Sequence, residues 1–355
     1  MISRPARDWP RAGGEPPATA RVRALAADFR VIELPLFEPD GSGQHVLLRV
    51  RKTGVNTDWL AGRLAALAGV ARHAVGYAGR KDRHAVAEQW FSIDLAGRPE
   101  PDWRTLDLAG VEILEAVRHG RKLKTGALRG NRFELTLREL RGDVRGCRER
   151  VERICREGVP NYFGPQRFGR RGDNVAQASA MFAGRLRVRG RGRRGILLSA
   201  ARAAIFNAVL AERVRRGDWN RPCPGDVLQL DGSRSWFVLD GGEDREAACR
   251  RCAEGDLHPT GPLWGRGDPP ALEDIGRLER ELAEGFPELV AGLTKTGMAH
   301  ARRSLRLPVR EVKWETGCEG ARLGFTLPPG GYATVVLREL VGAPAAGAGP
   351  AGEPG

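Results

Sequence analysis

The chain has 355 residues, of which 41% are hydrophobic, so it can bury a sizeable core, and its length is typical of about two domains. Its formal net charge of +14 favours a polyanionic partner, usually RNA or DNA, with an acidic protein surface or an acidic metabolite as the alternatives. No apolar stretch approaches the ~18 residues of a membrane span, and the first twenty residues lack the apolar region of a secretory signal. We therefore expect a cytoplasmic protein that does not bind a membrane.

Strand patterns dominate the first part of the chain. Val46, Leu48 and Val50 fall on one face of a segment whose other face carries arginines, which is typical of a half-buried strand. Either Asn56 or Thr57 can cap a helix that Gly69 ends. The patterns predict strands at residues 28–34, 45–52, 89–95, 111–117 and 133–138. So many strands favour an antiparallel or mixed sheet over a Rossmann-type unit.

Helical patterns begin after Asp143. They predict helices at residues 144–156, 172–182 and 196–215, strands at 309–314 and 323–327, and a closing helix at 333–341. Two strand-rich ends that bracket a more helical middle indicate one α+β domain interrupted by an insertion.

An arginine-rich run, Arg185–Arg194, lies between two of the expected helices and contains six arginines and no acidic residue. Such a run is usually a solvated loop, and contact with phosphates is the alternative that the net charge suggests.

Motifs for nucleotide cofactors and catalytic metals are missing from the sequence. There is no P-loop, no Gly-rich dinucleotide motif between a strand and a helix, and no zinc-hydrolase or deaminase motif. Cys249 and Cys252 form an isolated CxxC, with His258 as the only nearby histidine. Structural zinc needs four ligands, so we expect reduced thiols, no metal and no cofactor.

A polar loop at Gly76–Val86 holds the strongest candidate for chemistry. In it, Asp82 is surrounded by basic residues. Nearby positive charge favours the ionised carboxylate, which could act as a nucleophile or a base. Judged by local pattern alone, an Asp in a Gly-rich loop is more often a turn former or a helix cap.

Six long segments carry a more specific signal than any of these patterns. They are GYAGRKDRHAVAEQWFSI around Asp82 and the segments Arg118–Leu140, Gly158–Asn174, Leu198–Asn207, Gly225–Val238 and Pro328–Leu340. These segments resemble the TruD family of tRNA pseudouridine synthases and occur in the order typical of that family. The resemblance covers roughly residues 21 to 341 and is far more specific than any short motif.

The resemblance implies isomerisation of uridine 13 of certain tRNAs to pseudouridine, without cofactor or metal. It also implies an α+β pseudouridine synthase fold, with a mixed, largely antiparallel sheet and flanking helices, interrupted by an inserted α/β TRUD domain. The expected boundaries are a disordered leader at 1–20, a catalytic domain at 21–157 and 305–341, a TRUD domain at 158–304, and a disordered tail at 342–355. A basic cleft between the domains, a tRNA partner and a monomer are expected.

By the same resemblance, the catalytic aspartate of the family falls on Asp82 and its active-site aromatic residue on Phe133. Its substrate contacts fall on Phe29 and Asn131. Two positions, 332 and 23, depart from the family pattern.

A third substrate contact is usually Phe and is Tyr332 here, so the ring is kept but the hydroxyl needs a polar partner. The basic residue beside the aspartate is usually Lys and is Arg23 here. Arginine can pair with a carboxylate but does not readily release a proton.

Four further positions are expected to bind substrate. They are Lys81 beside the aspartate and Gln166, Arg167 and Phe168 in the segment that is expected to line the cleft.

Two other functions remain open from sequence. One is a non-catalytic RNA-binding protein on the same scaffold, although the presence of Asp82 favours catalysis. The other is a synthase that acts on another RNA. The sequence also leaves open whether Asp82 attacks C1′ or deprotonates C2′ of the ribose.

Overall fold

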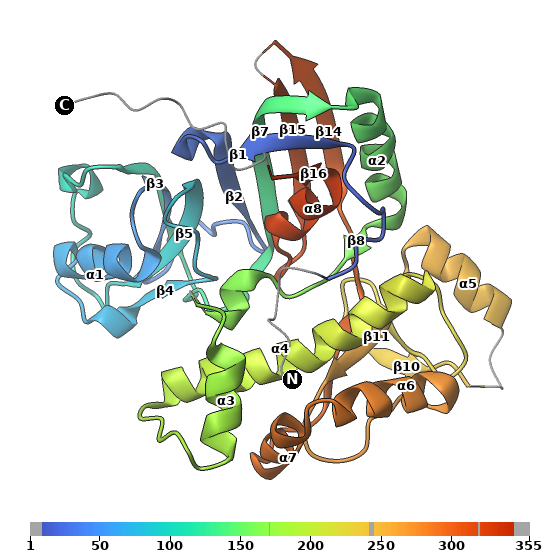
Figure 1. Ribbon diagram of the computed structural model, residues 1–355. Coiled ribbons are helices and arrows are strands. Elements are labelled where there is room, and N and C mark those ends of the chain that lie inside the picture. The colour runs from blue at the N-terminus through green and yellow to red at the C-terminus, as the bar shows by residue number, and fades with distance from the viewer. Residues whose placement is uncertain (1–8, 170, 241–244, 319, 344–355) are drawn as a thin grey trace, which may run out of the picture. The chain divides into compact units, whose positions relative to one another are not determined.

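The computed structural model describes residues 9–169, 171–240, 245–318 and 320–343 (Figure 1). These residues form two compact units that alternate along the chain. The sheet unit comprises Pro17–Val151, Val309–Gly331 and the residues from Val341 onward. The insert unit comprises the residues up to Pro16, Glu152–Pro308 and Tyr332–Leu340.

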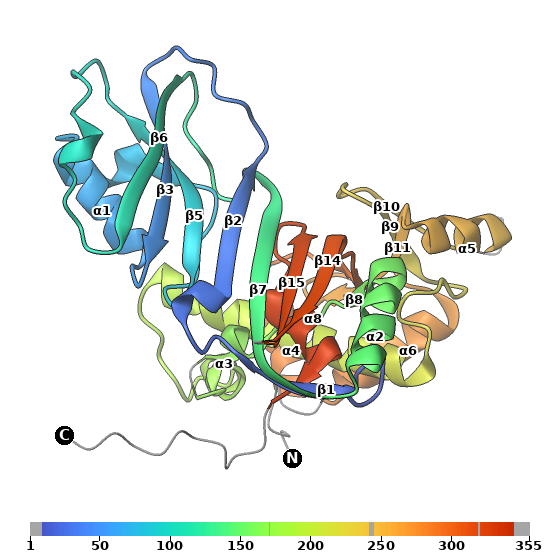
Figure 2. The ribbon, with the colours of Figure 1, turned by 90° about the horizontal axis from the view of Figure 1, so that it is seen from above.

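Ten strands of the described residues form one sheet in the sheet unit. They are β1 (Ala18–Val22), β2 (Phe29–Pro35), β3 (His45–Thr53), β4 (Val75–Tyr77), β5 (Val86–Asp94), β6 (Val111–His119), β7 (Leu128–Gly142), β14 (Arg310–Gly317), β15 (Gly320–Leu327) and β16 (Val341–Gly342). The order is β14-β15-β7-β2-β5-β3-β6, with β1 beside β7 and β16, and β4 beside β5 (Figure 2). Only the pairs β1–β16 and β2–β5 are parallel among the described strands, so the expected mixed, largely antiparallel α+β fold is confirmed.

The core of this sheet unit follows from strand alternation. In β3, Val46, Leu48 and Val50 are fully buried and pack with α1 (Thr57–Leu67). Helix α1 begins where the sequence predicts, because Asn56 Oδ1 accepts a hydrogen bond from Asp58 N at 2.8 Å and caps the helix. Helix α2 (Val144–Glu157) then leads from the sheet unit into the insert unit.

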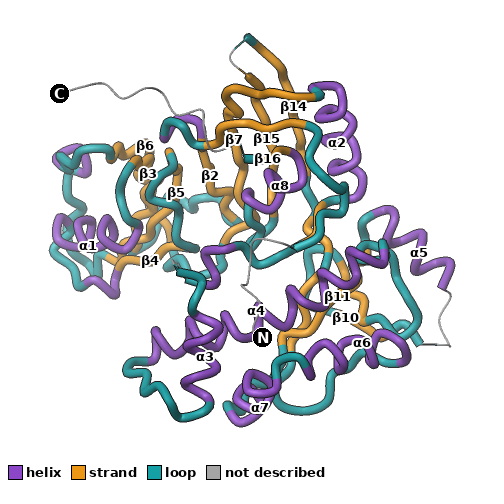
Figure 3. The backbone as a smooth tube through the Cα atoms, viewed as in Figure 1, coloured by secondary structure: helices purple, strands orange, loops and turns teal. Residues whose placement is uncertain are grey.

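The insert unit is built around a long helix, and Figure 3 shows how its helices and strands are distributed. Its helices are α3 (Asn174–Phe182), α4 (Arg191–Arg216), α5 (Arg245–Glu254), α6 (Glu273–Glu284), α7 (Pro287–Lys295) and α8 (Ala333–Leu340). Its strands are β8 (Val159–Pro160), β9 (Val227–Leu230), β10 (Trp236–Val238), β11 (Leu257–Leu263), β12 (Ala301–Ser304) and β13 (Arg306–Leu307). The strands pair in the order β10-β9-β11-β12, with β13 and β8 as a separate pair.

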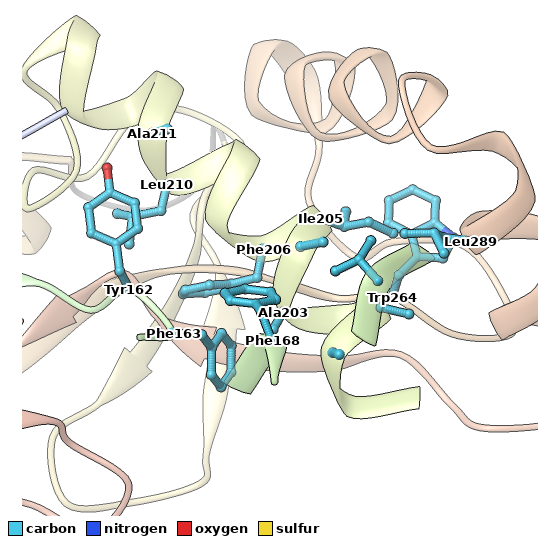
Figure 4. Close-up of a cluster of buried hydrophobic side chains, with 14 of the residues drawn as sticks. Tyr162, Phe163, Phe168, Ala203, Ile205, Phe206, Leu210, Ala211, Trp264 and Leu289 are labelled. Carbon is cyan, nitrogen blue, oxygen red and sulfur yellow. The ribbon is translucent and has the colours of Figure 1, made fainter. Parts of the chain in front are cut away.

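Helix α4 supplies much of the core of the insert unit. Phe206 and Leu210 of α4 are fully buried and lie among aromatic side chains, including Phe163, Phe168 and Trp264 (Figure 4). The helix is long and apolar enough to span a membrane by composition, but 61% of its most apolar window is buried inside the protein. We therefore interpret it as a core helix.

Three expectations about segment boundaries were wrong or incomplete. Within the expected disordered leader, Trp9 stacks on Tyr162 at 5.9 Å, and β1 pairs with β7. The arginine run is not all loop, because α4 begins at Arg191. Residues 332–340, expected in the catalytic domain, cluster with the insert unit. The rest of the predicted leader, residues 1–8, and residues 344–355 of the predicted tail lie outside the described residues.

Candidate active site

Asp82 lies in the loop between β4 and β5, and its carboxylate is held from two sides. Its Oδ2 is 2.8 Å from Arg23 Nη1, and its Oδ1 accepts a hydrogen bond from His84 N at 3.0 Å. The side chains of Asp82 and Arg23 keep 36% and 33% of their surface exposed. The structure therefore presents an oriented carboxylate that solvent can reach, and it brings together the two residues expected beside each other.

The loop that carries Asp82 is fixed to the sheet unit by buried polar side chains. Lys81 N donates to Thr57 Oγ1 at 3.1 Å, and Thr57 Oγ1 donates to Gln89 Oε1 at 3.2 Å. Gln89 Nε2 in turn donates to the carbonyl of Gly79. Both Thr57 and Gln89 are buried, so these bonds are shielded from water and fix the backbone of the loop.

The side chain of Lys81 points into the sheet unit rather than into solvent. Its side chain is 6% exposed and forms an ion pair with Glu33, which is 2% exposed. Glu33 Oε1 also accepts a hydrogen bond from Trp90 N at 3.2 Å. A buried charge is stable only when it is paired, so Lys81 anchors the loop to β2.

Arg23 occupies a strained backbone position beside the aspartate. Its φ is +61°, a left-handed value that is unusual for a residue with a side chain. Its guanidinium carbon lies 3.9 Å from the centre of the Phe29 ring, so the same side chain contacts an aromatic face and the Asp82 carboxylate. Strain of this kind is often found at functional sites.

An aromatic cluster continues from Arg23 along one face of the sheet. The Phe29 ring meets the Phe133 ring edge-on at 6.0 Å, and Phe133 stacks on Phe325 at 5.4 Å. Phe133 lies opposite Val31 on β2 and Phe325 on β15, which explains why these side chains share a face. The cluster is nearly fully buried.

Asn131 lies two residues before Phe133, directly opposite Glu33 of β2. Its Oδ1 is buried and has no hydrogen-bond partner among the described residues. A buried acceptor without a donor is unfavourable by about 1–3 kcal/mol. This atom is therefore poised to accept a hydrogen bond from a ligand.

Lys52 is a site residue that the sequence analysis did not identify. It is fully buried, and its Nζ donates to the carbonyls of Val55 at 2.8 Å and Asp82 at 3.3 Å. Burial lowers its pKa to about 8; Asp82 opposes this effect and Lys81 adds to it. The signal was available, because Lys52 continues the inward alternation of Val46, Leu48 and Val50 in β3.

Four of the residues expected to bind substrate lie in the insert unit, and they occupy two kinds of environment. Arg167 donates to Ser199 Oγ and to the hydroxyl of Tyr332, both at 2.9 Å, and Gln166 is exposed. The Tyr332 hydroxyl thus has the polar partner that it needs. Phe168 is fully buried in the core of the insert unit. In this structure it is a packing residue of that core.

The pair Cys249 and Cys252 shows no metal-site geometry. Cys249 is exposed and Cys252 is buried, and burial raises the pKa of the Cys252 thiol to about 12. Within the described part of the chain, no three His, Cys, Asp or Glu side chains are grouped so that they could hold a metal ion.

Known proteins resemble this chain over nearly its whole length. A family model described as tRNA pseudouridine synthase D (TruD) matches residues 12–187 and 186–340. A protein named tRNA pseudouridine synthase D from Nitrosococcus oceani is 48% identical over 333 residues, which cover 93% of this chain and 92% of that relative. A protein of the same name from Methylococcus capsulatus is 48% identical over 338 residues, with 94% of each chain covered.

A solved structure shows the same fold. The crystal structure of a putative tRNA pseudouridine synthase D (TruD) from Methanosarcina mazei matches with a TM-score of 0.73. The match covers 94% of this chain and 95% of that one at 20% sequence identity.

Proposed function

The chain belongs to the TruD family of tRNA pseudouridine synthases, and we propose that it isomerises uridine 13 of certain tRNAs with Asp82 as the catalytic carboxylate. The protein is accordingly an isomerase. One observation carries the assignment of Asp82: its carboxylate is oriented by Arg23 and His84 N, yet it remains partly exposed beside an aromatic cluster.

The reaction explains why a carboxylate is needed. The N1–C1′ bond of uridine must break, the uracil must turn, and C5 must bond to C1′ while it loses its proton. A carboxylate beside the ribose can attack C1′ as a nucleophile or remove a proton from C2′ as a base. Both routes need the ionised form of Asp82, and the Arg23 guanidinium pairs with that carboxylate at 2.8 Å.

Retention of the detached uracil falls to the residues around Asp82. We assign the aromatic cluster of Phe29 and Phe133 the role of an apolar wall, because an aromatic surface tolerates a base that changes orientation. We assign Asn131 the recognition of a donor on the substrate, because its buried Oδ1 has no hydrogen-bond partner in the described part of the chain.

Binding of the tRNA is assigned to basic residues. The net charge of +14 suits a polyanion, and tRNA is named in the relatives at 48% identity. In the insert unit, Arg167 is held by two neutral hydroxyls, those of Ser199 and Tyr332, so its charge remains available to a phosphate. A target inside folded tRNA must also be flipped out of its stack. We place this reaction in the cytoplasm.

Site-specific mapping tests the proposal. Purified protein is incubated with an unmodified tRNA transcript that carries uridine at position 13, and pseudouridine is located by carbodiimide modification and primer extension. A transcript with cytidine at position 13 is the control. We expect one new stop, at position 13. Tight binding without any pseudouridine would support the non-catalytic alternative, and a stop elsewhere would support a synthase with another target.

A further inference from the structure

We propose that Lys52 is a positioning residue for the reaction: its buried ammonium holds the main chain of Asp82 so that the carboxylate stays in its reactive place. The inference rests on the proposed role of Asp82.

The position of Lys52 is one that normally holds an apolar residue. Strand alternation directs it to the same side as Val46, Leu48 and Val50, and all four are fully buried. Lysine is almost never fully buried unless its charge is compensated. No carboxylate lies within ion-pair distance of Lys52 Nζ among the residues that the structure describes. A lysine at this place therefore calls for an explanation other than packing.

The contacts of Lys52 join two backbone segments at the site. Its Nζ donates to the carbonyl of Val55, just after β3, and to the carbonyl of Asp82 in the catalytic loop. Next to these bonds, Gly54 N donates to the carbonyl of Arg83 at 3.0 Å, and Arg83 Nε donates to the carbonyl of Gly54 at 2.8 Å. These hydrogen bonds join the two segments at adjacent residues, and the bonds of Lys52 are the buried ones.

Asp82 is consequently held at both ends. Lys52 holds its carbonyl from the interior, while Arg23 and His84 N hold its carboxylate on the open side. A displacement of about 1 Å at a reacting group can reduce a rate by roughly 10²-fold. Releasing the carbonyl frees the backbone of Asp82 to shift, although the Arg23 contact is unchanged.

The charge of Lys52 adds an electrostatic contribution to the same effect. The charged groups that act on it are Asp82, which favours the ammonium, and Lys81, which opposes it. Because burial lowers the pKa of Lys52 to about 8, the ammonium loses its proton as the pH rises through that value. Deprotonation removes one donor and the charge, so positioning weakens above about pH 8.

Replacement of the lysine tests the inference. Lys52→Met keeps the length of the side chain and removes the ammonium. We expect single-turnover pseudouridine formation to fall by roughly 10²-fold, with tRNA affinity within about two-fold of wild type. The melting temperature should not fall, because replacing a buried charge by an apolar side chain is often neutral or stabilising. A lysine that only supports the fold would give the opposite pattern, a lower melting temperature and a normal rate.

The matched control is Lys122→Met. Lys122 also donates from its Nζ to a backbone carbonyl, that of His73, but it is exposed, and its acceptor precedes β4 rather than lying beside Asp82. This variant should keep the wild-type rate. Asp82→Asn is measured in parallel: if it turns over, the proposed function fails, whereas an inactive Asp82→Asn beside a fully active Lys52→Met overturns only the role of Lys52.

The pH profile gives a second readout, which does not require Lys52→Met to fold. With saturating protein, the wild-type and Lys122→Met single-turnover rates should fall with a midpoint near pH 8, without loss of tRNA binding. Lys52→Met, where folded, should lack this limb. A wild-type rate that stays level from pH 7 to 9 contradicts the inference.

Discussion

Each unit contains an arginine–aspartate pair, and the two pairs have nearly the same contact distance but opposite surroundings. In the sheet unit, Arg23 Nη1 lies 2.8 Å from Asp82 Oδ2, and about a third of each side chain is exposed. In the insert unit, Arg213 Nη1 lies 2.8 Å from Asp226 Oδ1, and neither side chain is exposed at all. Distance alone therefore does not distinguish a reactive pair from a structural one.

The partners of the two pairs explain the difference. Asp226 also accepts from Arg213 Nη2 at 2.9 Å and from Cys223 N at 2.8 Å, and Arg213 Nε reaches Asp218 at 2.7 Å. Burial opposes the charge of Arg213, but the two carboxylates outweigh it and raise its pKa. The buried pair has its hydrogen-bonding capacity filled by protein. The open pair keeps about a third of each side chain accessible to solvent.

Asp82→Asn is the strongest test of the difference between the two pairs. The change keeps the size of the side chain but removes the charge that both routes require, so the chemical step should fall by ~10⁴-fold or more. Affinity for tRNA should stay the same or rise, because phosphates and stacking supply it. Tritium release from [5-³H]uridine-labelled tRNA measures the chemistry, and filter binding measures affinity.

Appreciable turnover by Asp82→Asn, with deamidation excluded by mass spectrometry, would falsify the assignment of Asp82. Loss of folding instead would indicate that Asp82 is a turn former, the other reading that its local sequence allows.

The second prediction concerns the buried pair. Asp226→Asn leaves the Arg213 charge poorly compensated, so the free energy of unfolding should fall by about 3–5 kcal/mol. Urea unfolding followed by tryptophan fluorescence measures the loss, and Trp219 is a buried reporter close in sequence to Asp218. The matched control is Asp274→Asn, which breaks an exposed ion pair with Arg277 and should cost less than about 1 kcal/mol.

The molecules of Asp226→Asn that remain folded should isomerise tRNA at close to the wild-type rate. A specific loss of rate at unchanged stability would remove the distinction between the two pairs.

The third prediction concerns the cation of the open pair. Arg23→Ala leaves Asp82 without its ion-pair partner, so the rate should fall by at least ~10²-fold, whereas Arg23→Lys should keep much of it. Arg21→Ala is the control, since Arg21 lies two residues away and pairs with Glu139 at 2.9 Å on a similarly exposed surface. Equal rates in Arg23→Ala and Arg21→Ala would show that position 23 has no special role.

The smallest expected effect concerns arginines with no carboxylate partner at all among the described residues. Arg191, Arg193 and Arg194 are exposed on the first turn of α4. Raising the salt from about 50 to 200 mM should weaken wild-type tRNA binding by at least ten-fold, and replacing all three by alanine should reduce the logarithmic salt slope by about 2.

The control for this triple variant removes Arg250, Arg277 and Arg280, which are exposed on other helices of the insert unit and carry the same total charge. An equal change of slope in both triple variants would indicate a general effect of net charge rather than contact at α4.

Sequence patterns were sufficient for elements whose partners are nearby in the chain. The cap at Asn56 and the alternation in β3 depend on local chemistry, and both are found as predicted. The Arg23–Asp82 contact came from family resemblance rather than pattern, since nothing in the local sequence places residues 59 apart together.

Sequence patterns are less informative where distant residues decide the environment of a side chain. From the local sequence, Lys81 is expected to be an unpaired cation. In the structure it forms a buried ion pair with Glu33, which lies 48 residues earlier in the chain. Phe168 lies in a polar segment, yet the core around α4 surrounds it. Strand alternation directs Lys52 inward, but its hydrogen-bond partners are carbonyl groups, which are present at every residue and so cannot be identified from a sequence.

The pairing of β1 with β16 means that the sheet unit is completed only late in synthesis. Ala18 lies beside Val341 and Thr19 beside Gly342, and β15 pairs with β7 and supplies Phe325 to the aromatic cluster. Most of the sheet unit therefore emerges from the ribosome before most of the insert unit, yet both units are completed only by segments that follow Pro308. A nascent chain acquires the complete aromatic cluster beside Asp82 only when residues 320–327 are translated, so premature termination before them leaves the site without Phe325 and the insert unit without Tyr332–Leu340.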